Sequence, residues 1–111
     1  MRAQDAAALR SWYARHLGIE ISDWGGHEFD WTDGGSTTWA IFDADTPYFG
    51  SPEQPYMINF RVDDLDAMLS QLRSDGVTVV DEITEHEFGR FGWAYDCEDN
   101  RFELWQPPPG R

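Results

Sequence analysis

Apolar residues recur at helical spacing in two stretches of the chain. In the first stretch the repeating positions are Leu9, Trp12, Tyr13 and Leu17. In the second stretch they are Leu65, Met68, Leu69 and Leu72. Asp5 and Asp63 are of the residue type that begins helices, and Gly18 and Gly76 are of the type that ends them. The spacing therefore predicts two amphipathic helices, over residues 5–17 and 63–76.

Alternation of apolar and polar residues, which is typical of half-buried strands, occurs after each helix. In the first half of the chain it predicts three short strands, near residues 19–21, 29–31 and 36–42. In the second half it predicts one strand over residues 56–62 and another from Val77 to about Glu85. Residues 43–54 contain three acids, two prolines and a glycine, so we expect them to connect the two halves.

The stretch from Gly89 to Pro107 predicts two more strands joined by a tight acidic turn. One face of the first strand carries Phe91, Trp93 and Tyr95. The turn, residues 96–100, is rich in turn formers, and Asn100 can take a left-handed conformation. The second strand covers residues 101–106 and ends at Pro107, which has no amide donor. One of its faces carries Arg101, Glu103 and Trp105.

The two halves repeat one another at an offset of 58 residues, which relates Asp5 to Asp63 and Gly18 to Gly76. Each half runs helix, strand, strand, strand, and a strand over 56–62 precedes the second. The repeat predicts one domain over residues 1–111 with two βαβββ modules, module one about 1–50 and module two about 55–107. The counterpart of the strand at 56–62 falls largely before residue 1. We therefore expect the first strand to be short or missing, or completed by a partner or by upstream residues.

The run from Asp96 to Trp105 carries a resemblance to a known family. It is similar to the C-terminal signature of the glyoxalase / bleomycin-resistance / extradiol-dioxygenase group, the vicinal-oxygen-chelate superfamily. Cys97 and Asp99 stand where that pattern usually has proline and glycine, and Glu103 is the glutamate of its last strand. The βαβββ module is also the module of this family, so the resemblance covers nearly the whole chain. It implies an α+β fold whose two modules form a curved, cup-shaped sheet with the helices outside.

Metal-dependent members of this family hold one divalent ion with four groups, one from each of four strands. Glu103 matches the last position, but Met57 stands where the third position usually has a histidine. The second position would fall within residues 36–42, which contain no His, Asp, Glu or Gln, and the first would precede residue 1. His16, His27 and His86 lie outside these strands. We therefore expect no metal and no other cofactor, which argues against metal-dependent glyoxalase or dioxygenase chemistry.

Strand parity, combined with the cup that the resemblance implies, predicts which side chains face a ligand. Ile58, Phe60 and Val62 should pack under the second helix, and Gly92 and Ala94 should also lie beneath a helix. The predicted ligand-binding residues are Trp39, Met57, Asn59, Arg61, Trp93, Tyr95, Glu103 and Trp105. Within this set we expect Arg61 and Glu103 to pair, because buried charges are costly unless they pair or meet a ligand. The same alternation also fits a cup filled by its own core.

Composition limits the partners. The chain has 21 acidic and 8 basic residues, a net charge of −13, so no basic patch is available for nucleic acid. The acidic charge favours cationic ligands, and six tryptophans favour an aromatic cleft or a dimer interface. With no long apolar run and no signal peptide pattern, we expect no membrane association and a cytoplasmic location. The single cysteine, Cys97, excludes an internal disulfide and is either an incidental or a reactive thiol.

Three hypotheses about function remain open. The first is a homodimeric protein, like the bleomycin-resistance members, that binds a small aromatic or cationic molecule in an aromatic cup without metal. The second is a lyase or isomerase of the same fold, with Glu103 as the candidate catalytic base. The third is a structural dimer with a packed cup. A metal-dependent glyoxalase- or dioxygenase-like enzyme would require ligands other than those that the spacing identifies.

Overall fold

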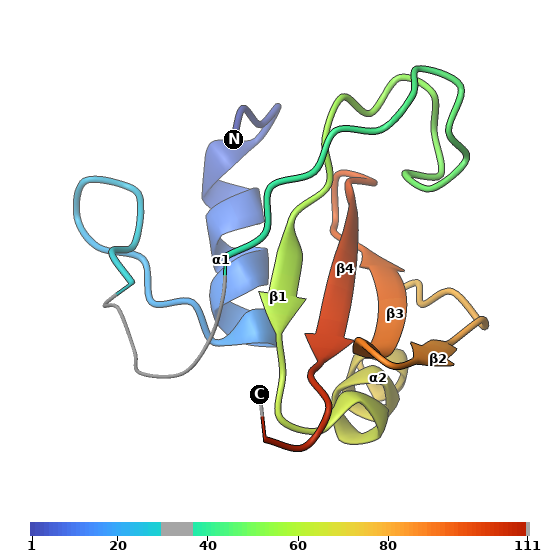
Figure 1. The fold of residues 1–111 in the computed structure, drawn as a ribbon. Coiled ribbons are helices and arrows are strands. Elements are labelled where there is room, and N and C mark those ends of the chain that lie inside the picture. Colours follow the sequence, from blue (N-terminus) through green and yellow to red (C-terminus); the bar gives the residue numbers. More distant parts are fainter. Residues whose placement is uncertain (30–36, 111) are drawn as a thin grey trace.

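The computed structural model describes residues 1–29 and 37–110. Two helices and four strands are described, in the order α1 Ala6–Leu17, β1 Asn59–Arg61, α2 Leu65–Ser74, β2 Thr84–His86, β3 Gly89–Tyr95 and β4 Arg101–Gln106 (Figure 1). The described strands form one open sheet in the order β1-β4-β3-β2. β4 runs parallel to β1 and antiparallel to β3, so the sheet is mixed. The predicted α+β class, with an open mixed sheet and two helices, is confirmed.

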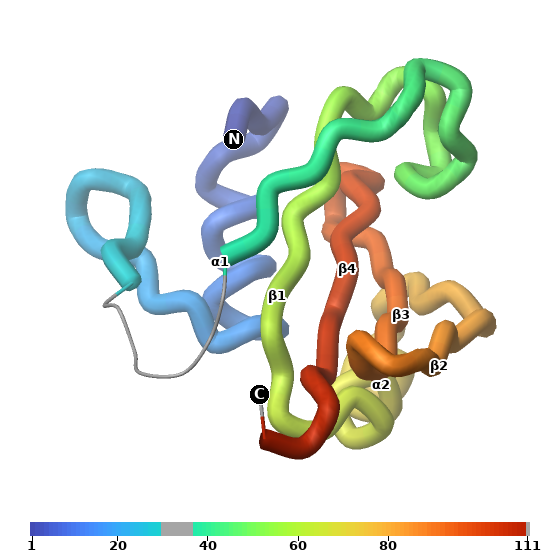
Figure 2. The backbone as a smooth tube through the Cα atoms, viewed as in Figure 1, coloured from blue at the N-terminus to red at the C-terminus, as the bar shows by residue number. Residues whose placement is uncertain are grey.

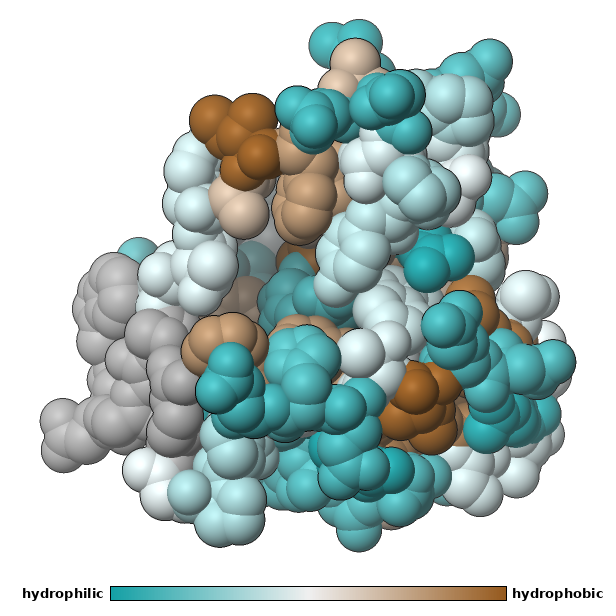
Figure 3. All heavy atoms as spheres, turned by 45° about the vertical axis from the view of Figure 1, so that its right-hand side comes forward, coloured by the Kyte–Doolittle hydropathy of each residue, from teal (hydrophilic) through white to brown (hydrophobic). Residues whose placement is uncertain are grey.

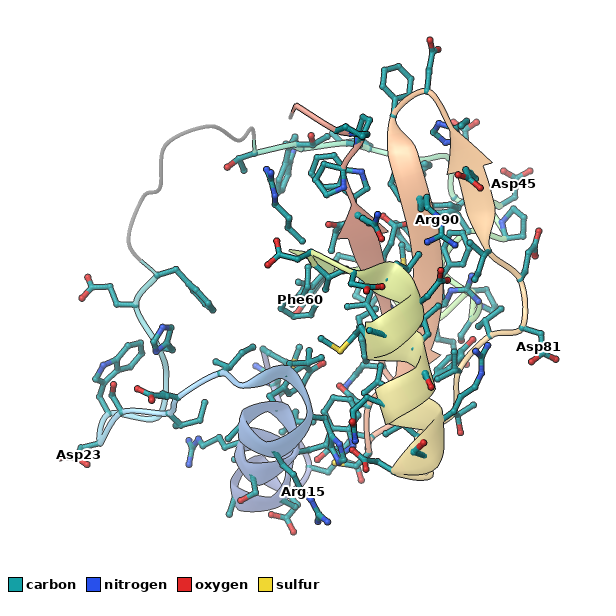
Figure 4. The ribbon with its side chains drawn as sticks, turned by 90° about the horizontal axis from the view of Figure 1, so that it is seen from below. Arg15, Asp23, Asp45, Phe60, Asp81 and Arg90 are labelled. Carbon is teal, nitrogen blue, oxygen red and sulfur yellow. The ribbon has the colours of Figure 1, made fainter. Side chains whose placement is uncertain are left out.

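Both helices pack on the same face of the sheet. On α1, the ring centroids of Trp12 and Tyr13 lie 5.7 and 6.3 Å from that of Phe102 on β4. Figure 4 shows Phe60 of β1 on this helix side of the sheet, where its ring lies 6.1 Å from that of Tyr13. The buried core joins one face of α2 to the strands: Leu65, Leu69, Leu72, Ala94, Phe102 and Leu104. The even-numbered residues Phe102 and Leu104 of β4 thus face the helices.

Glycine at position 92 lets α2 approach β3 closely. A Cβ atom at Gly92 would lie 3.0 Å from Leu69 Cδ1 and 3.5 Å from Leu65 Cδ1. The distance to Leu69 is shorter than ordinary van der Waals contact, so a side chain larger than that of glycine would push the helix outward. The sequence-based placement of Gly92 and Ala94 beneath a helix is correct.

The turn between β3 and β4 is organised by Asp96, which is 4% exposed. Its carboxylate accepts hydrogen bonds from the backbone amides of Glu98 and Asn100 and from the Asn100 side chain. The Tyr13 hydroxyl adds a bond of 2.7 Å from α1. Burial raises the pKa of the Tyr13 hydroxyl above its ordinary value, and the bond to Asp96 raises it further. The left-handed residue of this turn is Asp99, at φ 63°, and not Asn100 as the sequence suggested.

The helix ends follow the sequence signals with one correction. Asp5 caps α1 by accepting from the Ala8 amide, and Gly18 ends it in the left-handed region at φ 67°. The cap of α2 is Asp64, which accepts from the Ala67 amide, and not Asp63. The two aspartates are adjacent and both are residue types that suit a cap. Asp64 is the cap because its carboxylate accepts a hydrogen bond from the backbone amide three residues further on.

The strands expected in the first half are not formed within the described residues. Residues 19–29 contain only a tight turn, in which the Ser22 amide donates to the Gly26 carbonyl, and residues 37–42 form no strand. Trp31 and Ser36 lie outside the described residues. The strand predicted over 56–62 is shortened to β1, and that over 77–85 to a bridge at Val79 and to β2. An alternating pattern alone does not make a strand, because the backbone amides and carbonyls of a strand need a neighbouring strand with which to form hydrogen bonds.

Neither of the described helices has the length and apolar content needed to cross a membrane. Figure 3 shows a surface that is mainly hydrophilic, with separate and smaller hydrophobic patches. This agrees with the acidic composition of the chain.

Candidate functional site

The face of the sheet opposite the helices carries most of the predicted ligand-binding residues, and we call it the open face. Along β1, β3 and β4, the odd-numbered side chains point to this face and the even-numbered ones to the core. The open face is formed by Asn59, Arg61, Trp93, Tyr95, Arg101, Glu103 and Trp105. Strand pairing places Glu103 at the centre, directly between Asn59 on β1 and Trp93 on β3. Parity alone therefore brings a carboxylate, two indoles and two guanidinium groups onto one surface.

Glu103 is 6% exposed and is bonded by three neutral donors. Asn59 Nδ2 donates to Oε1 at 2.5 Å, and Trp93 Nε1 donates to Oε2 at 2.9 Å. The Tyr48 hydroxyl is the second donor to Oε2. Burial raises the pKa of Tyr48 above its ordinary value, and the bond to Glu103 raises it further. These three donors satisfy a buried carboxylate that has no cationic partner among the described ion pairs.

Phe42 and the predicted connector, residues 43–54, pack over one end of the open face, and we call residues 42–54 the covering segment. Figure 2 shows this part of the chain, in green, arching beside the upper ends of β1 and β4. The Tyr48 ring stacks on Phe42 at 5.2 Å and meets the Trp93 ring edge-on at 5.9 Å. At the end of the segment, the Gln54 amide bonds the backbone of Arg101 twice, at 2.7 and 2.9 Å. The segment thus covers the end of the predicted cup that carries Trp93 and Arg101.

Arg101 lies under the covering segment, beside the aromatic residues of β3. Its guanidinium carbon is 5.4 Å from the Trp93 ring centroid and 6.0 Å from that of Tyr95. Arg101 Nη1 donates to the Tyr95 hydroxyl at 3.3 Å. Its Nε atom is buried and has no hydrogen-bond partner among the described residues. Sequence reasoning placed Arg101 on this face but did not include it in the site.

The other predicted site residues do not all lie near Glu103. Arg61 lies over the Trp105 ring, at 5.8 Å, because the register of β1 sets it opposite Trp105. The predicted ion pair between Arg61 and Glu103 is not among those of the described residues. Met57 is partly buried just before β1, whereas Trp39 is 88% exposed. The structure therefore brings Asn59, Trp93 and Glu103 together, with Tyr95 beside Arg101, and leaves Trp39 at the surface.

Two residues of the site were missed: Tyr48 and Arg101. The only sequence signal for Tyr48 is an aromatic pair, Tyr48 and Phe49, within a connector that is otherwise polar and rich in proline. The signal for Arg101 is its shared parity with Glu103 on one strand.

The described residues do not fit the four-group metal site of the metal-dependent relatives. They contain no group of three or more His, Cys, Asp or Glu side chains that could hold an ion. His16 lies 3.4 Å from Asp75 on the helix side, and His86 stacks on Phe91. The lone pairs of Glu103 already accept bonds from three donors.

A cavity of about 260 Å³ lies on the helix side of the sheet, away from Glu103. Its walls include the rings of Tyr13, Tyr56 and Phe102 and the side chain of Ile58. The polar side chain of Gln54 at its rim is already bonded to the backbone of Arg101. Asn100 and Arg101 also line this cavity, whereas the buried carboxylate of Glu103 lies on the open face.

The comparisons with known proteins agree with this architecture. The family model of the Glyoxalase/Bleomycin resistance protein/Dioxygenase superfamily matches residues 1–104, and the chain belongs to this superfamily. No protein of curated function gives a match.

Similar solved structures cover nearly the whole chain. One is TnmS3, an antibiotic binding protein from Streptomyces sp. CB03234, with 22% identity over 97% of this chain and 91% of that chain and a TM-score of 0.62. A second is a glyoxalase/dioxygenase from Nostoc punctiforme, with 15% identity over 97% and 87% and a TM-score of 0.60. A third is a glyoxylase/bleomycin resistance protein/dioxygenase domain from Frankia sp. EAN1pec, with 19% identity over 98% and 88% and a TM-score of 0.57. At these identities the likeness establishes the fold alone.

Proposed function

We propose that this protein binds a small aromatic molecule on the open face without a metal ion. The observation that carries the proposal is the group formed by buried Trp93 and Glu103 with half-buried Tyr95 and Arg101, beneath a segment that is not part of the sheet. Aromatic faces beside a few fixed polar groups are the usual lining of small-molecule sites. The antibiotic binding described for TnmS3 supports the same class of function on this fold.

Metal independence is part of the proposal. A divalent ion at Glu103 would need other anionic or imidazole ligands, and the nearest hydrogen-bond partners of Glu103 are a phenol, an amide and an indole. Because both oxygens of Glu103 accept hydrogen bonds, three in all, we assign it a structural and orienting role. A catalytic base would instead need a lone pair directed at the substrate.

We also propose that the protein works as a homodimer in a reducing compartment such as the cytoplasm. Trp39 and Ile41 are 88% and 86% exposed, and large exposed apolar side chains of this kind commonly mark interfaces. The exposed free thiol of Cys97 suits a reducing environment. Light scattering at several concentrations tests the dimer, and Trp39→Ser is expected to shift it toward monomer. A monomeric wild-type protein at all concentrations would contradict the dimer.

The binding proposal is tested by titration calorimetry with three probes that share a naphthalene ring: 2-naphthoate, 2-naphthamide and 2-naphthylmethylammonium. Binding of at least one probe is expected, with the same affinity before and after treatment with a chelator. Trp93→Leu should weaken binding about tenfold through loss of aromatic contact. The matched control is Trp24→Leu, because Trp24 is 74% exposed in the turn after α1. Absence of binding by all probes, or binding only with added metal, would overturn the proposal.

A further inference from the structure

Among the described residues, Arg101 is a cation without an ion-pair partner, although the chain is strongly acidic. The protein carries 21 acidic residues, yet no ion pair within the described residues includes Arg101. By contrast, Arg90 meets both Asp66 and Glu85. The described contacts of the Arg101 guanidinium are one phenol hydroxyl and two aromatic faces. A guanidinium has five N–H donors, and the described hydrogen bond to the Tyr95 hydroxyl engages one of them.

The Nε–H group of Arg101 is the donor that most clearly lacks an acceptor among the described residues. It is buried from solvent and donates to no described acceptor. A buried donor that lacks an acceptor loses its bond to water without replacement, so native structures keep few of them. An acceptor supplied by a ligand would remove this penalty, and an anionic oxygen would also balance the charge.

The covering segment packs directly on this group from the open face. A Cβ atom at Gly50 would lie 2.8 Å from the Tyr95 hydroxyl oxygen and 3.0 Å from Arg101 Cδ, so the segment's backbone rests directly on both side chains. The backbone hydrogen bonds described for the segment close within it, for example from Gly50 to Pro47. Its ties to the sheet are the Tyr48 bond to Glu103, the aromatic contact with Trp93 and the Gln54 bonds at its end. Release of Tyr48 would therefore expose Arg101 and Trp93 together.

We propose that the ligand is an aromatic molecule with an anionic oxygen, a carboxylate or a phenolate. Its ring replaces Tyr48 against Trp93, and its oxygen accepts the hydrogen bond of Arg101 Nε after the covering segment moves aside. This inference rests on the proposed binding function and deepens it by naming the ligand class.

The same geometry disfavours a cationic ligand, although the overall charge of the chain suggested one. The position of a cation over Trp93 and Tyr95 is already taken by the Arg101 guanidinium. A second cation beside it would be repelled at short range, where little water screens the charges. The negative oxygens of Glu103, which would attract a cation, are engaged by three donors.

The three naphthalene probes test the ligand class on the wild-type protein. We expect 2-naphthoate to bind at least about tenfold more tightly than 2-naphthamide, since a charge-assisted bond to a buried guanidinium is stronger than a neutral one. The ammonium probe should bind most weakly. If the amide or the ammonium binds as tightly as the carboxylate, this inference is overturned and the binding proposal stands. If none binds, the binding proposal fails, and this inference with it.

Substitutions then test Arg101 itself. In Arg101→Gln the affinity for 2-naphthoate should fall at least about tenfold, with little change for the amide. Arg101→Lys keeps the charge but loses the planar Nε donor, so it should also weaken carboxylate binding. The control for net charge is Arg15→Gln, because Arg15 lies on α1, on the helix side of the sheet (Figure 4). An equal loss in Arg15→Gln, or wild-type affinity in Arg101→Lys, would refute the assigned bond. If Arg101→Gln does not fold, the affinities of the three probes for the wild-type protein and of 2-naphthoate for Arg101→Lys test the assigned bond instead.

Discussion

Removal of one hydroxyl, by Tyr48→Phe, should make the protein less stable and at the same time a better binder. The hydroxyl of Tyr48 donates to the buried carboxylate of Glu103, and hydrogen bonds to charged groups contribute about 1.5–3 kcal/mol. Glu103 keeps its donors Asn59 and Trp93, so we take the lower end, about 1.5 kcal/mol. For 111 residues, an unfolding entropy of about 2.1 cal/mol/K per residue turns this into a fall in Tm of about 6 °C.

The gain in affinity follows because the same bond holds the covering segment closed. If the ligand binds only the open form, its apparent Kd is the intrinsic value divided by the open fraction. A loss of about 1.5 kcal/mol from the closed form raises a small open fraction about tenfold, and the affinity for 2-naphthoate should rise accordingly. The phenylalanine retains the ring for contact with Phe42 and Trp93. Calorimetric titration and thermal unfolding measure the two effects on the same sample.

Tyr13→Phe is the matched control for this experiment. It also removes a phenol that donates to a buried carboxylate, that of Asp96, but it lies on the helix side of the sheet. It should lower the Tm to a similar extent and leave the Kd for 2-naphthoate unchanged. If Tyr48→Phe binds no more tightly than wild type, the covering segment is a fixed part of the fold and does not open for the ligand. An increase in affinity in both variants would point to general loosening instead.

Three other contacts can be tested by single changes. Gly92→Val should lower the free energy of unfolding by about 1–3 kcal/mol in urea titrations, because Leu69 already lies 3.0 Å from the Cβ position; unchanged stability would contradict the packing of α2 on β3. The Arg90 guanidinium holds the pKa of Asp66 below its ordinary value, so the stability that Asp66 contributes is present above the ordinary carboxyl pKa and is lost as the pH falls through the lowered one. The Tm curves of wild type and Asp66→Asn should therefore converge in acid, and a constant gap would refute this. Slight burial and nearby carboxylates raise the pKa of Cys97, so iodoacetamide should modify it more slowly than free cysteine at mildly alkaline pH; faster reaction would show an activated thiol.

Local signals were sufficient to predict the two helices and the hairpin of β3 and β4. The hairpin of β3 and β4 and the division of its side chains between two faces follow from alternation and from the turn at Asp96. α1 follows from the cap at Asp5, the apolar spacing and the left-handed Gly18. These features depend on residues that are close in sequence, which is why a single sequence contains them.

Strand register was the first feature that local signals could not supply. Parity places Arg61 and Glu103 on the same face, and this made an ion pair between them plausible from the sequence alone. The parallel register of β1 and β4 instead sets Asn59 opposite Glu103 and Arg61 opposite Trp105. A shift of two residues would have set Arg61 opposite Glu103 without changing any face. Register depends on the whole sheet, so the pairing was beyond sequence reasoning.

Strand partners in the first half were the second such feature. Residues 37–42 have the alternation of a strand, but Trp39 and Ile41 are exposed and the described segment forms no ladder. The pattern states which residues suit a pleated surface, whereas a strand also needs amides and carbonyls alongside it.

Glu103 shows how one strand position can serve different purposes within a fold. The resemblance assigns this position to metal binding, where a carboxylate needs free lone pairs and further ligands nearby. Here two donors from the sheet, Asn59 and Trp93, fix the carboxylate, and a third from the covering segment, Tyr48, completes its bonding. Under the proposed function, the group that would hold an ion in a metal-dependent relative instead holds the covering segment closed. The step that admits the ligand is then the release of one phenol, and its cost is set by the hydrogen bond that Tyr48→Phe removes.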